Sequence, residues 1–165
     1  MTHISTHRVR RVAGTVSTDD IIPARYKHMH TDPGRLAPHL FEAYLPGFVE
    51  SVRPGDAIVS DSVFGIGSSR EQAVSTLLAN GISLVIAPRF GRILFRNCWN
   101  LALPAIEADT GDLSEGMTIS VDLERGEIRS EGDVIAGFPK PPLFLLEMIA
   151  SGGLLNRVKP SPSGA

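Results

Sequence analysis

The chain has 165 residues, of which 42% are hydrophobic and 21% charged, and its formal net charge is −2. This length suits one domain with a core of its own, and this composition excludes an intrinsically disordered chain. The near-neutral charge argues against a general nucleic-acid-binding protein, no apolar run approaches the roughly 20 residues that span a membrane, and the N-terminus lacks the apolar stretch of a secretory signal, so we expect a cytoplasmic protein with no membrane partner.

Strands and helices alternate along the chain, which indicates a mixed α/β fold. The first third of the chain is expected to form a strand over 8–16, a polar loop over 17–32 anchored by Ile21 and Ile22, and helical turns over 36–52 broken at Pro38 and Pro46. There follow a strand over 57–60, a glycine-containing loop over 61–67, a helix over 69–79 ended by Asn80–Gly81, a strand over 83–87 and a helix over 90–101. The last part is expected to form short strands over 117–137 with a turn at Arg125–Gly126, and a helix over 143–150 ended by Gly152–Gly153. Residues 1–7 and 158–165 are expected to be flexible ends of a single domain over 8–157.

The glycine-rich turn Phe64–Glu71 (FGIGSSRE) follows one of these strands and opens one of the helices. Glycine lets the backbone adopt positive φ and approach a ligand closely. Ser68 can cap the helix, with Glu71 three residues later completing a capping box, and the free N–H groups of a first helical turn attract anions. The turn is therefore a candidate anion site. It is not a Walker loop, because no Gly-Lys-Ser/Thr follows, nor a dinucleotide fingerprint, because the third glycine is absent.

Arg70 is expected on the same helical face as Val74 and Leu77, which should point to the core. A buried guanidinium requires an anionic partner, and its planar fork suits a carboxylate. That partner is either a bound ligand or an internal acid, Asp61 or Glu71, and the sequence leaves both interpretations open.

Three arginines at helical spacing, Arg89, Arg92 and Arg96, stand in a stretch, 84–106, that contains no acid. Residues 107–133, in contrast, contain nine of the chain's 18 acids. The stripe is interpreted either as a solvated basic face or as a surface that docks a partner or steers an acidic substrate.

The opposite stripe of this helix, Phe90, Leu94, Cys98 and Leu101, is a candidate core face. Cys98 is the only cysteine, so we expect it to be a small buried hydrophobic residue rather than a nucleophile. One cysteine also excludes an internal disulfide and an iron–sulfur cluster held by this chain's own thiolates.

The histidines His28, His30 and His39 lack the cysteine or carboxylate spacing of a metal site. We therefore expect His28 and His30 to be loop residues, and no metal bound by this chain.

Three segments, in this order, resemble the short small subunits of the aconitase superfamily. Thr18–Tyr26 (TDDIIPARY) resembles the opening T-D-x-I-I-P-A-R-Y, Phe64–Glu71 resembles the signature F-G-x-G-S-S-R-E, and Ser83–Leu103 (SLVIAPRFGRILFRNCWNLAL) resembles the strand–helix segment that follows. The resemblance runs from about residue 8 to residue 157 and points first to the small subunits of 3-isopropylmalate dehydratase and then to those of homoaconitase.

The resemblance implies a swivelling domain with three β/β/α layers over residues 8–157, and a partner. That partner is a large subunit with a [4Fe–4S] cluster, without which this chain is inactive. The implied activity is that of a hydro-lyase, which reversibly dehydrates and hydrates a hydroxylated di- or tricarboxylic acid. The first candidate is the isomerisation of 2-isopropylmalate and 3-isopropylmalate in leucine biosynthesis. The alternatives are a homoaconitase or dimethylmalate-type small subunit and a non-catalytic anion-binding domain.

The resemblance also implies roles for individual residues. Ser68 matches the serine that acts as the base, and Asp19 matches an acid near the site. Arg70 matches the arginine that binds a substrate carboxylate, and Ser69 supports the oxyanion or the substrate by a hydrogen bond.

The residues after Tyr26 form the loop that distinguishes substrates in relatives. Lys27-His28 and Met29-His30 match neither the Leu-Arg of homoaconitase-like enzymes nor the apolar pair of isopropylmalate enzymes. The basic pair Lys27 and His28 is a candidate contact for an additional substrate carboxylate.

Overall fold

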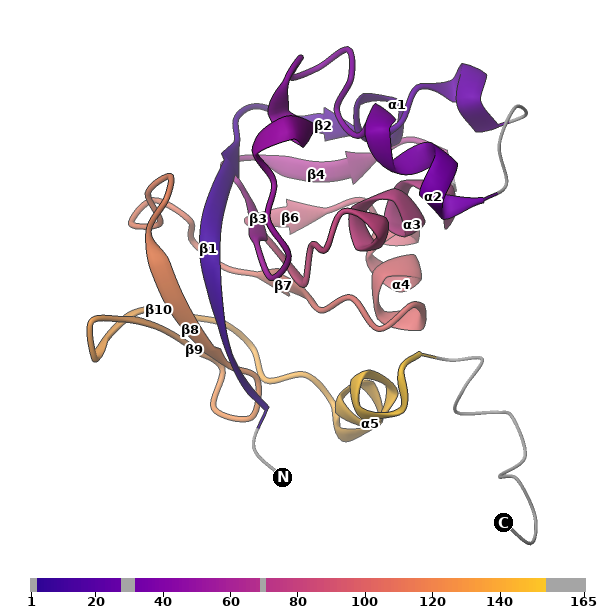
Figure 1. The fold of residues 1–165 in the computed structure, drawn as a ribbon. Coiled ribbons are helices and arrows are strands. Elements are labelled where there is room, and N and C mark those ends of the chain that lie inside the picture. Colours follow the sequence, from indigo (N-terminus) through magenta and orange to yellow (C-terminus); the bar gives the residue numbers. More distant parts are fainter. Residues whose placement is uncertain (1–2, 28–31, 69–70, 154–165) are drawn as a thin grey trace, which may run out of the picture.

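The computed structural model describes residues 3–27, 32–68 and 71–153, and Figure 1 shows two sheets with helices gathered along one side. The helices and 3₁₀ turns are α1 (Thr18–Ile21), η1 (Ala24–Lys27), α2 (Pro33–Leu36), η2 (Ala37–His39), η3 (Phe48–Ser51), α3 (Glu71–Ala79), α4 (Arg92–Asn100) and α5 (Leu143–Ser151). The strands are β1 (Ile4–Val12), β2 (Val16–Ser17), β3 (Ala57–Ser60), β4 (Val63–Ile66), β5 (Leu84–Ala87), β6 (Arg89–Phe90), β7 (Ala105–Glu107), β8 (Thr118–Asp122), β9 (Glu127–Ser130) and β10 (Asp133–Gly137).

The larger sheet has seven strands in the order β10-β9-β8-β1-β3-β5-β7. β1, β3, β5 and β7 are parallel, whereas β8 pairs antiparallel with β1 and continues as an antiparallel meander through β9 and β10. The smaller sheet is parallel, in the order β2-β4-β6.

The smaller sheet continues three neighbouring parallel strands of the larger one. β1 resumes as β2, β3 as β4 and β5 as β6, each after a gap of one to three residues, and the neighbours keep the same order. The bends are joined to one another, because the Gly14 N–H donates to Asp61 Oδ1 at 2.7 Å and the Thr15 and Ser62 hydroxyls lie 3.0 Å apart. The carboxyl ends of all three strands therefore reach one edge (Figure 1).

Two cores lie on opposite faces of the larger sheet, because successive side chains of a strand alternate. Leu84 and Ile86 of β5 face a core shared with β8 and β9, whereas Val85 and Ala87 face a core shared with the helices. The meander thus covers one face of the parallel strands and the helices cover the other. This arrangement gives the three β/β/α layers that the resemblance implied.

Most expected elements are confirmed, with shifted bounds. The strand 57–60 and the turn at Gly126, where φ is +69°, lie where predicted, and Gly81 (φ +81°) ends α3. The strand expected over 8–16 instead begins at Ile4, inside the expected flexible N-terminus, because β8 pairs with it from Ile4 onward.

Three strands and several short helical turns were not predicted. The loop expected over 61–67 contains β4, the helix expected from residue 90 is preceded by β6, and β7 was missed. The loop expected over 17–32 contains α1 and η1. None of the helices in the described ranges is long and apolar enough to cross a bilayer.

Candidate functional site

Three connections meet at the carboxyl edge of the small sheet. The chain passes from β2 into α1, from β4 into the glycine-rich turn, and from β6 into α4. In parallel α/β sheets this edge is where ligands bind, because the loops that leave it are free to carry functional groups. The topology therefore brings the Thr18–Asp19 pair and Ser68 to one end of the molecule, although 49 residues separate Asp19 from Ser68.

The backbone of the glycine-rich turn approaches α4 too closely for any side chain. A Cβ on Gly65, whose φ is +85°, would lie 2.0 Å from Leu94 Cδ2, and a Cβ on Gly91 would lie 2.1 Å from the Gly65 carbonyl oxygen. The Gly91 N–H donates to the Phe64 carbonyl at 2.9 Å. Two glycines thus lock the turn against the start of α4.

Thr18 fixes the other side of the turn. Its side chain is buried, and its hydroxyl donates to the Ser68 carbonyl at 3.2 Å. A Cβ on Gly67, whose φ is +110°, would lie 3.2 Å from the same hydroxyl oxygen. Ser68 is exposed at the end of this clamped turn, as a residue that meets a substrate has to be.

Asp19 stands in the first turn of α1, which has a capping box. The Ser17 hydroxyl accepts from the Asp20 N–H at 3.1 Å, and the Asp20 carboxylate accepts from the Ser17 N–H at 2.8 Å. Ile21 and Ile22 anchor the helix in the core, as predicted. Asp19 is exposed on this helix, next to Thr18, whose hydroxyl bonds the Ser68 carbonyl.

Tyr26 and Glu42 hold the segment that precedes residues 27–30, which the resemblance links to substrate choice. The Tyr26 hydroxyl donates to Glu42 at 2.7 Å, and its ring stacks on His39 with 3.9 Å between centroids. The hydrogen bond from Tyr26, followed by His39 and Arg25, holds the pKa of Glu42 below its usual value. His39, at the end of η2, therefore packs against Tyr26. Lys27 ends η1, next to this cluster.

Four of the predicted site positions, Ser69, Arg70, His28 and the side chain of Lys27, lie outside the part of the chain that the structure describes. The predicted capping of α3 by Ser68 stays a prediction, because residues 69–70, between Ser68 and the start of α3, are also outside the described part. The expected core stripe is confirmed in part: Leu94 and Cys98 are buried in α4, whereas Phe90 lies in β6 and Leu101 follows the helix.

The three arginines Arg89, Arg92 and Arg96 are exposed, as either interpretation requires. The prediction that all three lie on one helix is wrong for Arg89, which lies in β6, before α4 begins at Arg92. A shallow polar cavity of about 290 Å³ lies between Arg92, Arg96 and Glu107. The basic stripe thus borders both the candidate site, through the first turn of α4, and the acidic region that begins at Glu107.

Cys98 does not suit a cluster. Its side chain is fully buried, and burial raises the pKa of its thiol to about 12, whereas cluster ligands are thiolates. Across residues 3–27, 32–68 and 71–153 no group of three His, Cys, Asp or Glu side chains is placed to hold a metal ion.

The sequence reasoning overlooked Thr18 and Gly91. Thr18 was treated only as part of a motif, yet its buried hydroxyl donates the hydrogen bond that fixes the Ser68 carbonyl. Gly91 lies between the two-residue strand β6 and α4. A glycine just before a helix was the only sign in the sequence that the backbone of the Gly65 turn approaches it closely.

Comparison with known proteins places this chain in a family. Residues 48–110 match the family model of the aconitase C-terminal domain. The chain is 43% identical over 162 residues to the 3-isopropylmalate dehydratase small subunit of Nautilia profundicola, covering 95% of both chains. It is 42% identical over 156 residues to the isopropylmalate/citramalate isomerase small subunit of Methanocaldococcus jannaschii, covering 92% of both.

Solved structures agree. The crystal structure of 3-isopropylmalate dehydratase from Methanocaldococcus jannaschii superposes with a TM-score of 0.85 at 37% identity, over 93% of this chain and 92% of that one. Aconitase X from Thermococcus kodakaraensis shares the fold, with a TM-score of 0.50 at 14% identity over 82% of this chain and 90% of that one. The resemblance read from the three motifs is thereby confirmed, and the chain belongs to the family of 3-isopropylmalate dehydratase small subunits in the aconitase superfamily.

Proposed function

We propose that this chain is the small subunit of a cytoplasmic two-subunit hydro-lyase that interconverts 2-isopropylmalate and 3-isopropylmalate, in leucine biosynthesis. The observation that carries the proposal is the clamped turn, because it presents Ser68 beside α1 at the carboxyl edge of the small sheet. The names of the relatives that match along nearly the whole chain support the same reaction.

Ser68 is the proposed base, which removes the proton from the carbon next to a substrate carboxylate. A serine alkoxide is too basic to persist in water, so the site has to stabilise the charge. We propose that backbone N–H groups at the start of α3 and the Arg70 guanidinium stabilise this negative charge, and that Ser69 donates a further hydrogen bond.

Asp19 is proposed to orient the charged partners of Ser68, and Arg70 to bind the substrate carboxylate. Lys27 and His28 are proposed to contact the part of the substrate that differs between family members. A binding module would have no need of an exposed serine held in this way, which favours the enzyme over the non-catalytic alternative.

The [4Fe–4S] cluster that the superfamily implies does not fit this chain, since its only thiol is buried in the core. We therefore assign the cluster to the large subunit, where it would bind the leaving hydroxyl group. Half of the reaction site, the proton-removing half, then belongs to this chain.

Anaerobic co-expression with the large subunit from the same source tests the proposal. We expect the reconstituted complex to convert 3-isopropylmalate and the isolated chain to be inactive. A complex with a loaded cluster that converts no hydroxy acid would overturn the catalytic assignment.

A second substrate class is favoured by one observation, the basic pair Lys27-His28 after Tyr26, which suits an extra carboxylate. The same assay therefore includes homocitrate and dimethylmalate, and also citramalate, which the name of one relative includes. Faster conversion of one of these than of 3-isopropylmalate would reassign the substrate and leave the reaction class unchanged.

A further inference from the structure

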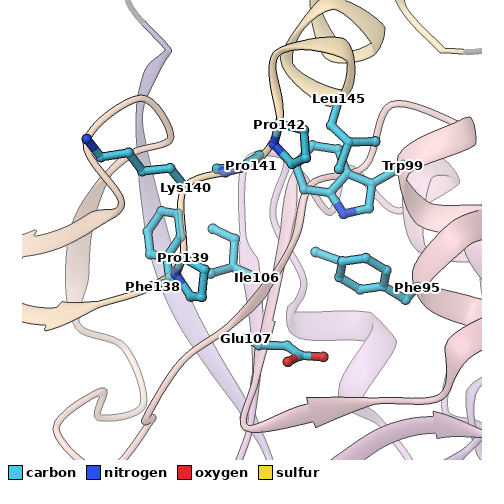
Figure 2. Close-up of a pocket in the computed structure, with 11 residues that line it drawn as sticks. Phe95, Trp99, Ile106, Glu107, Phe138, Pro139, Lys140, Pro141, Pro142 and Leu145 are labelled. Carbon is cyan, nitrogen blue, oxygen red and sulfur yellow. The ribbon is translucent and has the colours of Figure 1, made fainter.

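A second cavity lies away from the candidate site, between α4, β7 and the segment that joins β10 to α5 (Figure 2). Its volume is about 310 Å³. A dry cavity of about 150 Å³ is enough to bind a benzene ring, so this one has room for an aromatic side chain. Its walls are largely apolar and come mainly from Phe95, Trp99, Ile106, Phe138 and Leu145.

Two large apolar side chains are exposed beside this cavity. Leu143 and Phe144, the first residues of α5, are 71% and 54% exposed, and the next residue, Leu145, lines the cavity. Exposed apolar side chains that adjoin an open apolar cavity form the kind of patch that binds another molecule. The same face of the chain thus carries both exposed apolar side chains and a cavity that suits such side chains.

The segment beside this patch is stiff before anything binds. Three of the four residues between Phe138 and Leu143 are prolines, and the proline ring fixes φ. A surface that is already ordered loses little conformational entropy when it binds a partner. The face is therefore suited to an interface that forms without rearrangement.

Opposite charges line the cavity on different walls. Glu107, at the end of β7, and Lys140, in the joining segment, are exposed, and in the described part of the chain neither forms an ion pair. Figure 2 shows the Lys140 ammonium pointing away from the cavity and from Glu107. In a two-fold symmetric interface each residue of a contact occurs on both sides, so these charges can pair twice between two copies. The face is thus complementary to itself in charge and in apolar character.

We propose that this face binds a second copy of the chain about a two-fold axis. Phe144 of each copy enters the cavity of the other, and Glu107 of each copy pairs with Lys140 of the other. The large subunit is needed at the carboxyl edge of the small sheet, whereas in Figure 1 α5 lies below α4, with β2 and β4 above it. The dimer does not depend on the proposed reaction.

Sedimentation velocity of the full chain tests the apolar contact. We expect a reversible dimer with a dissociation constant below about 100 µM. Phe144→Ser is expected to raise this constant at least about tenfold, because buried aromatic side chains dominate the binding energy of interfaces. The matched control is Val134→Ser in β10, at an apolar side chain of similar exposure, which should leave the constant unchanged.

Charge reversal tests the pairing between copies. Glu107→Lys and Lys140→Glu each place like charges opposite one another, and each should weaken the dimer at least about tenfold. An equimolar mixture of the two variants should form a mixed dimer about as tight as the wild type, because each supplies the charge that the other lacks. Glu131→Lys makes the same change in the turn between β9 and β10 and should dimerise like the wild type.

The substituted side chains are exposed, so we expect all of these variants to fold. Three results would overturn the proposal: a wild type that stays monomeric at millimolar concentration, a dimer unchanged by Phe144→Ser, or reversed variants whose mixture associates no better than either alone. A large subunit that dissociates the dimer and binds Phe144→Ser more weakly would assign the cavity to that subunit instead.

Discussion

Gly65 has a left-handed backbone conformation, and the Leu94 side chain occupies the space where a Cβ would be. Gly65→Ala therefore has to strain the backbone and displace Leu94, and overpacking alone typically costs about 1–3 kcal/mol. We expect a lower urea midpoint for this variant. Gly116→Ala is the matched control, because Gly116 has φ +82° but nothing within 4 Å of the added Cβ. Equal losses in both variants would show that Leu94 yields freely.

Ser68→Ala tests the proposed base. We expect kcat of the reconstituted enzyme to fall by about 10²–10⁴-fold, the range for a general base, while KM and assembly with the large subunit change little. Ser114→Ala, at an exposed serine outside the site, is the control. Full turnover in Ser68→Ala would disprove this role and leave the family assignment intact.

His7 makes stability depend on pH. Burial lowers its pKa below the usual 6.5, against smaller raising effects from the Gly55 carbonyl and Asp56. We assign the neutral form, in which Nδ1 donates to the Gly55 carbonyl at 2.9 Å and Nε2 accepts from the Ser5 hydroxyl at 2.6 Å.

Below the ordinary pKa of histidine the unfolded chain takes up a proton at His7 that the folded chain does not. The contribution of His7 to stability is thus complete above about pH 6.5 and is lost as the pH falls through that value towards the lowered folded pKa. We expect urea midpoints of the wild type to fall more steeply than those of His7→Gln over this window. Parallel curves would mean that His7 titrates normally when folded.

Individual residues were predictable where one property decides their place. Cys98 and Gly81 were placed correctly because burial of a thiol and a helix-ending glycine are local rules. Thr18 was not predicted, since its hydroxyl bonds to a carbonyl 50 positions later and no local pattern encodes that distance.

At the level of elements, the sequence indicated the long ones and missed those that exist through their neighbours. β5 is a continuous apolar run, whereas β6 has two residues and β4 contains a glycine, so that neither carries a strand pattern of its own. Their hydrogen bonds to each other and to β2 define them. The sheet that holds the site was therefore invisible, although the motifs at its edge were not.

The capping box of α1 gives an element-level test. Ser17→Ala removes the acceptor for the Asp20 N–H, which should cost about 0.5–2 kcal/mol. Because α1 presents Asp19 and Thr18, we also expect turnover to fall, by up to about 10²-fold, the cost of a small misplacement. Ser17→Thr keeps the acceptor and should restore both properties. Normal turnover in Ser17→Ala would show that the cap of α1 does not position the catalytic residues.

Across the whole molecule, charge is segregated between the arginine stripe and the acidic region after it. If the stripe docks the large subunit, Arg92→Gln/Arg96→Gln should slow association about tenfold at low salt and flatten its salt dependence. Stopped-flow mixing of the two subunits measures this rate. Arg35→Gln/Arg125→Gln removes two exposed charges elsewhere and should have little effect. Equal rates in both variants would identify the stripe as a solvated face.

β1 precedes the other described strands along the chain and lies in the middle of the seven-stranded sheet, between β3 and β8. A ribosome adding about 5–20 residues per second needs roughly 5–20 s to reach β8 after finishing β1, and during that time β1 has at least one open edge. Open edges pair with other chains unless charges prevent it. Arg8, Arg10 and Arg11 lie in β1, and in the finished protein Arg10 bonds Glu115 at 2.7 Å while Arg11 bonds the Thr110 carbonyl at 2.8 Å. We therefore expect the same guanidinium groups to oppose aggregation of the nascent strand. In the folded protein they bond the segment that precedes β8.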